Sequence, residues 1–284
     1  MRTELLTFTD HSRHFNNCKY VYPVLSRRAK GISLGINLNL NNTCNWKCIY
    51  CQVEGLTRGK PESLDMVLLE HELSGMLEWI SNGDFIQKFA PNNMQRLNDI
   101  CLAGNGEPTL SPDFLAVCEL ITKLRDKYNI SNNVKTILIT NGSQVSQQKV
   151  RQGLTILSKI NGEIWFKIDR IHPESILQTN QVNLSAELIS KNLILASQHC
   201  KTLIQSCWFA NNGIFPTQRE IIDFTTFIIE HRQYIDKILL YSVARPTAQA
   251  EGKHIYQFTQ NDFNFLENIF IQNMGVQQFF FKFS

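Results

Sequence analysis

Apolar residues recur along the chain with two different periods, and the two periods alternate from one segment to the next. Between residues 31 and 38 apolar residues alternate with small or polar ones, which is the period-two pattern of a strand. Between residues 65 and 80 the apolar residues fall three and four positions apart, as on one face of a helix, with Ser63 or Asp65 available as its N-terminal cap. The pattern predicts a chain built from strand–helix units.

The same alternation continues to the end of the chain. Further strands are expected at residues 99–103, 134–140, 163–169, 202–209 and 237–243. Further helices are expected over residues 111–128, 146–160, 185–197, 217–231 and 262–272. Ser111 with Pro112 is expected to start the first of these helices, and Thr217 with Glu220 forms a capping box before the fourth. Residues 81–98 are expected to form a loop or a short extra element, and the aromatic tail at 276–283 to add an edge strand or cover the sheet.

Alternating strands and helices predict an α/β fold with a parallel sheet and right-handed crossovers. About six strand–helix units are too few to close an eight-stranded barrel. The expected fold is therefore a partial (β/α)6 TIM-like barrel with parallel strands. No flexible linker or repeat divides the chain, so we expect an N-terminal extension at residues 1–30, a core domain at 31–250, and a C-terminal helix and tail at 251–284 that pack on the core.

Composition excludes few functions. The chain has 284 residues, of which 43% are hydrophobic and 19% charged, as in a globular protein with a substantial core. A net charge of +3 neither requires nor excludes a nucleic-acid partner. No apolar run approaches the roughly 20 residues of a membrane span, and an acidic residue interrupts the start where a signal peptide would be apolar. We expect a cytoplasmic protein without a membrane partner, in a compartment where thiols stay reduced.

Three of the eight cysteines, Cys44, Cys48 and Cys51, are spaced C-x3-C-x2-C directly behind the first predicted strand. Three thiolates this close can serve one compact metal site. In a [4Fe–4S] cluster, three cysteine ligands leave one iron without a protein ligand, and that iron can bind a small molecule. The alternative is zinc with a fourth ligand from elsewhere, although the second C-x2-C or histidine pair that is typical of structural zinc sites is missing.

The other five cysteines are scattered through the sequence. We interpret Cys101 and Cys118 as small buried apolar residues, because both lie in apolar segments. Cys18, Cys200 and Cys207 could meet in space and hold a second cluster, a question that the sequence leaves open.

Small and polar residues follow the predicted strands, at the edge where parallel α/β folds bind ligands. These segments are Gly104 to Thr109, Asn141-Gly142, Lys167 to Arg170, and Arg245-Pro246. Each also has a plain structural interpretation. The glycine segment and Asn141-Gly142 are ordinary turn sequences, Lys167 and Asp169 can form an internal ion pair, and Arg245 can bind a ligand or simply follow a strand.

These residues carry a resemblance to the radical S-adenosylmethionine (SAM) superfamily, which covers roughly residues 30–245. The loop has the pattern C-x3-C-x-aromatic-C with Tyr50 at the aromatic position, and Gly104-Asn105-Gly106-Glu107-Pro108 is similar to that superfamily's "GGEP" segment. The resemblance implies that the three cysteines ligate a [4Fe–4S] cluster whose open iron is chelated by SAM. It also implies an electron donor such as flavodoxin or ferredoxin. The implied SAM contacts are Tyr50 beside the adenine, the backbone of Asn105, Gly106 and Glu107 at the ammonium, Asn141 at the ribose or carboxylate, Lys167 at the carboxylate, and Asp169 at the ribose.

Residues 26–37 and 241–246 resemble a branch of that superfamily, the wyosine-synthase-like Fe–S oxidoreductases, which includes tRNA-modifying enzymes. Only Cys18 precedes the motif, whereas wyosine synthases carry further N-terminal cysteines, so the chain is not expected to be wyosine synthase itself. The first hypothesis is a radical SAM enzyme that modifies RNA or another macromolecule. The alternatives are the same chemistry on a peptide or in activating a glycyl-radical enzyme, and a non-catalytic Fe–S or zinc-binding module. Arg27, Arg28 and Lys30 favour RNA as the substrate.

Overall fold

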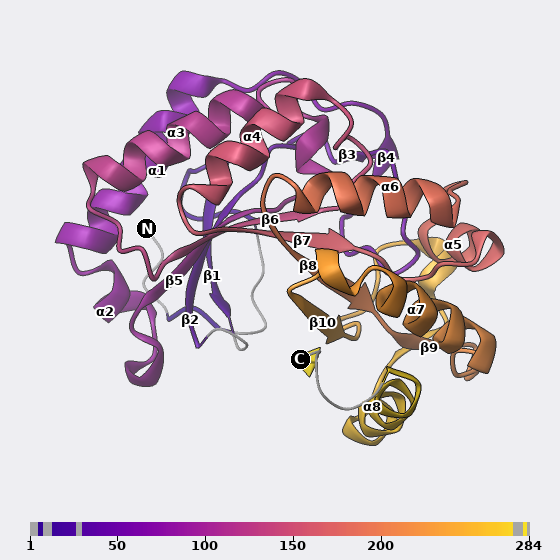
Figure 1. The fold of residues 1–284 in the computed structure, drawn as a ribbon. Coiled ribbons are helices and arrows are strands. Elements are labelled where there is room, and N and C mark those ends of the chain that lie inside the picture. The colour runs from indigo at the N-terminus through magenta and orange to yellow at the C-terminus, as the bar shows by residue number, and fades with distance from the viewer. Residues whose placement is uncertain (1–4, 8–12, 27–29, 275–280, 283–284) are drawn as a thin grey trace.

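The structure is a computed structural model that describes residues 5–7, 13–26, 30–274 and 281–282. Its centre is an eight-stranded sheet with the strand order β1-β2-β5-β6-β7-β8-β10-β12 (Figure 1). The strands are β1 (Val21–Ser26), β2 (Gly31–Ile36), β5 (Leu97–Leu102), β6 (Lys135–Thr140), β7 (Gly162–Lys167), β8 (Lys201–Cys207), β10 (Lys237–Tyr241) and β12 (Phe281–Lys282).

The strands β2, β5, β6, β7, β8 and β10 all run parallel to one another. Each of them is followed by a helix, and the helices form an arc along one face of the curved sheet (Figure 1). These helices are α1 (Met66–Asn82), α3 (Phe114–Lys127), α4 (Gln148–Ser158), α6 (Ala186–Ser197), α7 (Gln218–Glu230) and α8 (Gln260–Met274). The predicted partial barrel of six parallel strand–helix units is confirmed.

Both edges of the sheet carry an additional strand. β1 pairs antiparallel with β2, from Val21 opposite Ile36 to Ser26 opposite Gly31. This strand was not predicted, although Pro23 within it is compatible with an edge position, where a missing N–H costs no ladder bond. At the other edge β12 pairs parallel with β10, so residues 281–282 of the tail add the expected edge strand. The rest of the tail, at 276–280 and 283, lies outside the described residues.

The two faces of the sheet differ in polarity. Side chains such as Ile100, Leu138 and Ile164 are fully buried on the helix-covered face. Residues that alternate with them along the strands, such as Cys101 and Trp165, line a cavity on the opposite face. Successive side chains on a strand point to opposite faces. The apolar residues of each strand therefore lie under the helices, and the residues that alternate with them, some polar and some apolar, face the cavity.

Three local elements differ from the prediction. α3 begins at Phe114 with Asp113 as its N-cap, because residues 108–110 form a short 3-10 helix whose last bond is donated by Ser111. The strand expected at 202–209 is divided, since β8 ends at Cys207 and Phe209–Asn211 forms β9, which pairs with β11 (Ile255–Gln257). The short helix α5 (Pro173–Asn180) was missed, although Pro at its first position and Glu174 in its first turn are typical start signals.

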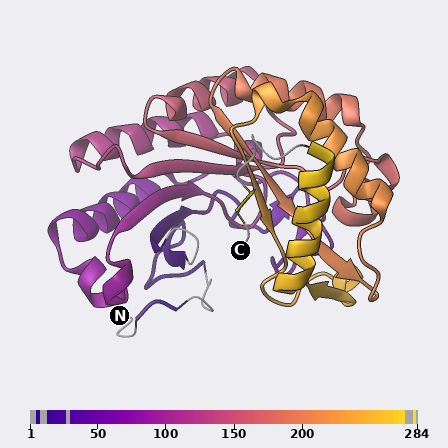
Figure 2. The ribbon, with the colours of Figure 1, turned by 60° about the horizontal axis from the view of Figure 1, so that its bottom comes forward.

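The last helix closes the C-terminal side of the core. Figure 2 shows α8 beside α7 at the edge of the sheet, where the two helices pack against each other. Phe270 of α8 lies with its ring centroid 5.6 Å from Trp208 and 5.6 Å from Phe224, and all three side chains are fully buried. No helix in the described ranges combines the length and apolarity needed to cross a membrane.

The capping box predicted at Thr217 is present and gives a direct test of the local fold. The Thr217 side chain accepts from the Glu220 backbone, and the Glu220 side chain accepts from Thr217. Replacing Thr217 by alanine removes that acceptor, so the free energy of unfolding should fall by about 1 kcal/mol. Urea denaturation measures it, and Thr217→Ser, which keeps the hydroxyl, should restore most of the loss. Equal stability of all three proteins would contradict a stabilising cap.

Candidate functional site

The three motif cysteines lie on the loop that follows β2, at the carboxyl ends of the parallel strands. Cys44 ends the short strand β3 (Thr43–Cys44), which pairs with β4 (Thr57–Arg58). Cys48 is buried, whereas Cys44 and Cys51 are half-buried. All three line one cavity of about 520 Å³ that runs along the inner face of the sheet. The strand edge that the sequence predicted as the ligand site is therefore the wall of a real cavity.

The cysteine loop is fixed by segments that lie far away in the sequence. The Thr247 hydroxyl donates to the carbonyl oxygens of Ile49, at 2.7 Å, and of Cys51, at 2.9 Å. On its other side, the loop donates backbone hydrogen bonds from Ile49 to the Thr179 carbonyl at 2.9 Å and from Lys47 to the Asn180 carbonyl at 3.2 Å. These contacts hold the loop rigidly without using any cysteine side chain.

Two hydrogen bonds reach the cysteine sulfurs. The Asn180 amide donates to Cys48 Sγ at 3.3 Å, and the Trp46 backbone N–H donates to Cys44 Sγ at 3.4 Å. Burial raises the pKa of Cys44 to about 12 and that of Cys48 to about 11. Both thiols therefore stay protonated at neutral pH until a metal displaces the proton. Donors aimed at sulfur suit metal-bound thiolates, whose added negative charge they stabilise.

The donor set fits a cluster. Among the described residues no three His, Cys, Asp or Glu side chains come close enough together to hold a single metal ion. The ligands of a [4Fe–4S] cube bind separate irons, so its cysteines need to face a common cavity rather than a common point. Cys44, Cys48 and Cys51 meet that requirement.

The glycine segment packs directly against the cysteine loop. A Cβ atom on Gly104 would lie 2.1 Å from Asn37 Oδ1, and one on Gly106 would lie 1.9 Å from the Thr43 carbonyl oxygen. Asn105 donates from its backbone to Asn37 Oδ1 at 3.0 Å and from its side chain to Asn42 Oδ1 at 2.7 Å. Gly106 is needed because the backbone of the cysteine loop approaches too closely for any side chain, and Gly104 because the Asn37 side chain fills the space that a Cβ would take.

Glu107 and Asn141 join the glycine segment to the end of β6. The Glu107 carboxylate accepts from the Asn141 backbone N–H and from the Thr140 hydroxyl, at 2.6 Å each. Burial raises the pKa of Glu107, against the effect of these hydrogen bonds. The Asn141 amide in turn donates to Asn45 Oδ1, on the cysteine loop, at 2.9 Å. Donors of the protein itself thus bind the Glu107 carboxylate. Glu107 and Asn141 together fix the rim of the cavity.

Asp169, just beyond the end of β7, organises several side chains around the cluster loop. It is 1% exposed, and one oxygen accepts from the Cys207 backbone N–H at 2.9 Å. The other oxygen accepts from the Asn180 amide at 2.7 Å and from the Tyr50 hydroxyl. Since Asn180 also donates to Cys48 Sγ, Asp169 orients a group that touches a predicted metal ligand.

Lys167 lines the cavity above this carboxylate. Its Nζ lies 3.5 Å from Asp169 Oδ2, 3.2 Å from the Tyr241 hydroxyl and 4.5 Å from the centre of the Tyr50 ring. Burial alone would lower the pKa of Lys167, but Asp169 and Tyr241 hold it well above its usual range. The internal ion pair is present, and the ammonium remains charged at a surface that a bound carboxylate could reach.

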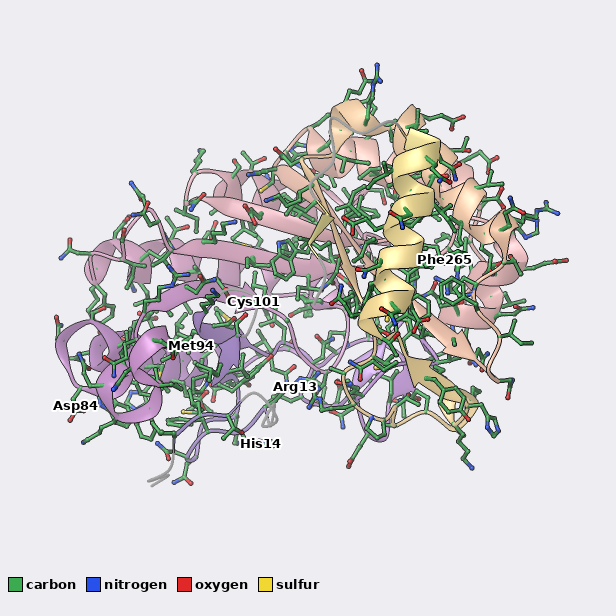
Figure 3. All side chains as sticks on the ribbon, turned by 90° about the horizontal axis from the view of Figure 1, so that it is seen from below. Arg13, His14, Asp84, Met94, Cys101 and Phe265 are labelled. Atoms are coloured by element: carbon green, nitrogen blue, oxygen red, sulfur yellow. The ribbon has the colours of Figure 1, made fainter. Side chains whose placement is uncertain are left out.

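Two arginines also line this cavity, of which only Arg245 was a sequence candidate. Arg245 lines the cavity and donates to Gln52 Oε1 at 2.6 Å. Arg13, from the N-terminal segment, bonds to Asn105 Oδ1 and also lines the cavity, and Figure 3 places it towards the middle of the molecule as seen from below. Cys200 and Cys207 flank the length of β8, roughly 23 Å apart at about 3.3 Å per residue, and therefore cannot share a cluster.

Sequence reasoning missed Asn180 and Thr247. Asn180 ends a helix that was not predicted, and its role depends on a contact across 132 residues. Thr247 lies just after the last predicted core strand, and its contacts span 198 and 196 residues. Nothing in their local sequence distinguishes either residue from an ordinary surface polar residue.

Comparison with known proteins finds sequence relatives for part of the chain. No family model matches the sequence. A UPF0026 protein of Synechocystis is 27% identical over 169 residues, which is 59% of this chain and 55% of that protein. A UPF0026 protein of Helicobacter pylori is 36% identical over 135 residues, which is 46% of this chain and 37% of that protein. The chain thus spans about half or less of these relatives.

Solved structures extend the comparison to most of the chain. Streptococcus suis SuiB bound to S-adenosylmethionine matches 91% of this chain and 52% of its own, with a TM-score of 0.60 and 14% identity. The structure of anSMEcpe with bound AdoMet matches 84% of this chain and 57% of its own, with a TM-score of 0.53 and 19% identity. The predicted fold class is confirmed: over most of its length the chain has the fold of these two proteins, both of which were solved with bound S-adenosylmethionine.

Proposed function

We propose that this chain is a radical SAM enzyme. Cys44, Cys48 and Cys51 would hold a [4Fe–4S] cluster with one iron left for SAM, and an electron donor such as flavodoxin or ferredoxin would reduce it. The single observation that carries the proposal is that three cysteines face one cavity at the carboxyl ends of the strands, with hydrogen bonds to two of the sulfurs. When bound, such a cluster supplies the electron that cleaves SAM into methionine and a 5′-deoxyadenosyl radical.

The chain's own residues would bind and orient SAM. The proposed contacts are Tyr50, the backbone of Asn105, Gly106 and Glu107, and the side chains of Asn141, Lys167 and Asp169. Lys167 supports this assignment best, because its ammonium is largely buried, stays charged and faces the cavity. The Asp169 carboxylate already accepts three hydrogen bonds from protein groups, so in our proposal its contribution is chiefly to position Tyr50 and Asn180.

The substrate that we propose is an RNA or another macromolecule, as for the wyosine-synthase-like branch. Of the three basic residues that favour RNA, Arg27 and Arg28 lie outside the described residues, so the preference still depends on the sequence. A tRNA complex whose affinity falls steeply with salt would support RNA as the substrate. A glycyl-radical signal on a partner protein would support the activating-enzyme alternative.

The direct test is anaerobic reconstitution of the purified protein with iron and sulfide. We expect a broad visible absorption from iron–sulfur charge transfer and, after dithionite and SAM are added, release of 5′-deoxyadenosine, measured by liquid chromatography and mass spectrometry. An intact cluster that never cleaves SAM would instead support the non-catalytic module, and tight zinc binding without iron would support the zinc alternative.

Asn180 provides a more specific prediction. Replacing it by alanine removes the hydrogen bond to Cys48 Sγ, so the cluster should become harder to reduce, and iron affinity or SAM cleavage should fall by about 10- to 100-fold. A redox titration followed by electron paramagnetic resonance measures the potential. Leu177→Ala, at a position of α5 that is 54% exposed, is the matched control and should leave the potential unchanged. An unchanged potential in the Asn180 variant would show that the contact does not tune the cluster.

A further inference from the structure

Cys101 lies inside the cavity rather than in the apolar core where the sequence placed it. It is 8% exposed, belongs to β5 and lines the cavity together with the three motif cysteines. The other four cysteines do not line this cavity. Figure 3, seen from below, places Cys101 towards the middle of the molecule. It lies three residues before Gly104, roughly 10 Å along an extended strand, and so just beneath the proposed SAM contacts.

The surroundings of Cys101 keep its thiol protonated. Its strand neighbours in register are Gly35 on β2 and Ile137 on β6. The Tyr22 ring covers Gly35 so closely that a Cβ atom there would lie 2.3 Å from the ring. Burial, and then the nearby Asp99 carboxylate, hold the pKa of Cys101 well above its usual range. A protonated thiol can give up a hydrogen atom, whereas a thiolate cannot.

A second observation shows that the cavity is prepared for a polar ligand. Gln205 on β8 is 7% exposed and lines the same cavity beside Lys167, its partner in register. Its side-chain amide makes no hydrogen bond with the described part of the chain, unlike the neighbouring Lys167 ammonium. The Gln205 amide is therefore free to bond to whatever occupies the cavity. A ligand group with both donors and acceptors, such as an amide or the edge of a nucleobase, would match it.

We propose that the cavity beneath the SAM contacts is the substrate site and that the Cys101 thiol donates a hydrogen atom to a carbon radical of the ligand bound there. The inference rests on the proposed function, since a radical must first be generated. The ligand belongs to the class of organic molecules that present an amide-like or nucleobase-like edge to Gln205. Cys101 is then a catalytic residue, because its sulfur touches the reacting carbon.

The step balances in atoms and electrons. The S–H bond of Cys101 breaks homolytically and a C–H bond forms on the ligand, which leaves a thiyl radical on Cys101. A one-electron reductant, the same class that the proposed function requires, then supplies one electron, and water supplies one proton. The thiol is restored, and the net result is addition of one electron and one proton to the ligand radical.

The test uses the radical from SAM itself as the probe, so no substrate needs to be known. The reconstituted protein is incubated with SAM and dithionite in D2O, where thiol hydrogens exchange with solvent. We expect wild-type protein to yield mostly singly deuterated 5′-deoxyadenosine. Cys101→Ser and Cys101→Ala should lose that deuterium while keeping the iron content, because neither side chain has a weak S–H bond.

Two matched variants identify the source of the label. Cys118→Ser changes a thiol that is fully buried in α3, away from the cavity, and should retain the label. Tyr22→Phe removes the exchangeable phenol beside Cys101 and should also retain it. Deuterium that persists in both Cys101 variants, or unlabelled product from wild-type protein, would overturn the inference alone. Absence of any 5′-deoxyadenosine would instead overturn the proposed function, and the inference with it.

A second readout needs no turnover. Without reductant, the loaded protein is treated with methyl methanethiosulfonate, a small thiol reagent, and the modified cysteines are mapped by peptide mass spectrometry. SAM should slow modification of Cys101, because it closes the cavity above that thiol, while Cys118 remains unmodified throughout. Modification of Cys101 at the same rate with and without SAM would contradict its place beneath the bound SAM.

Discussion

Replacing Cys48 by alanine should abolish both iron–sulfur binding and SAM cleavage. Cys48 is the most buried of the three motif cysteines, and its sulfur accepts the Asn180 hydrogen bond. A cluster held by three protein ligands has no spare ligand to replace one that is lost. After anaerobic reconstitution we therefore expect the iron content and the visible absorption to fall to background, and no 5′-deoxyadenosine to form.

The matched control for this prediction is Cys118→Ala. Cys118 is even less exposed than Cys48 but lies in α3, packed beside Gly153 on the helix-covered face of the sheet. This variant should keep full iron content and lose only the stability that a small buried side chain contributes. SAM cleavage that survives in Cys48→Ala, with iron still bound, would refute the proposed ligand set.

Replacing Gly106 by alanine should have the second-largest effect. The new Cβ would lie 1.9 Å from the Thr43 carbonyl oxygen. That oxygen belongs to the backbone of the cysteine loop, so the clash can be relieved only by moving the loop and the glycine segment apart. We expect the free energy of unfolding to fall by about 1–3 kcal/mol and the cluster to be lost or unstable, because Cys44 directly follows Thr43.

Gly75→Ala is the control for the glycine substitution. Gly75 is exposed within α1, and a Cβ there would meet no atom within 4 Å. Alanine should stabilise that helix by about 0.5–1 kcal/mol without affecting iron content. Urea denaturation and iron analysis of both variants test the pair. Normal iron content and stability in Gly106→Ala would mean that the two backbones do not meet as described.

The regular part of the fold was accessible from sequence because its signals are local. Residues 134–140 and 237–243 are short apolar runs, and the capping box at Thr217 lies within four residues, so each can be recognised without knowing the rest of the chain. β1 was missed because its partner is needed to distinguish an edge strand containing Pro23 from an extended tail. The division of β8 from β9 likewise depends on pairing with β11, which lies more than forty residues later.

Of the candidate site, the sequence could predict only the residues that belong to recognisable motifs. The cysteine spacing and the polar strand ends located the cavity, and one further thiol, that of Cys101 (labelled in Figure 3), lines it. Sequence could not place Cys101, because the face of β5 that turns inward depends on strand register. It also could not reveal that Asp169 and Glu107 are already engaged by several protein donors. Such networks are formed by side chains from different strands and appear only in three dimensions.

The long-range contacts that hold the cysteine loop also set an order of events during protein synthesis. The Thr247 hydroxyl reaches back 198 residues to Ile49, and the Lys47–Glu251 ion pair spans 204 residues. At about 5–20 residues per second, these contacts are translated roughly 10–40 s after the cysteines emerge from the ribosome. Before residue 247 is made, only the contacts with Thr179 and Asn180 are available to hold the cysteine loop. If the proposed cluster is present, we expect it to be inserted only after residue 247 has been translated, because the contacts that complete the loop form after that point.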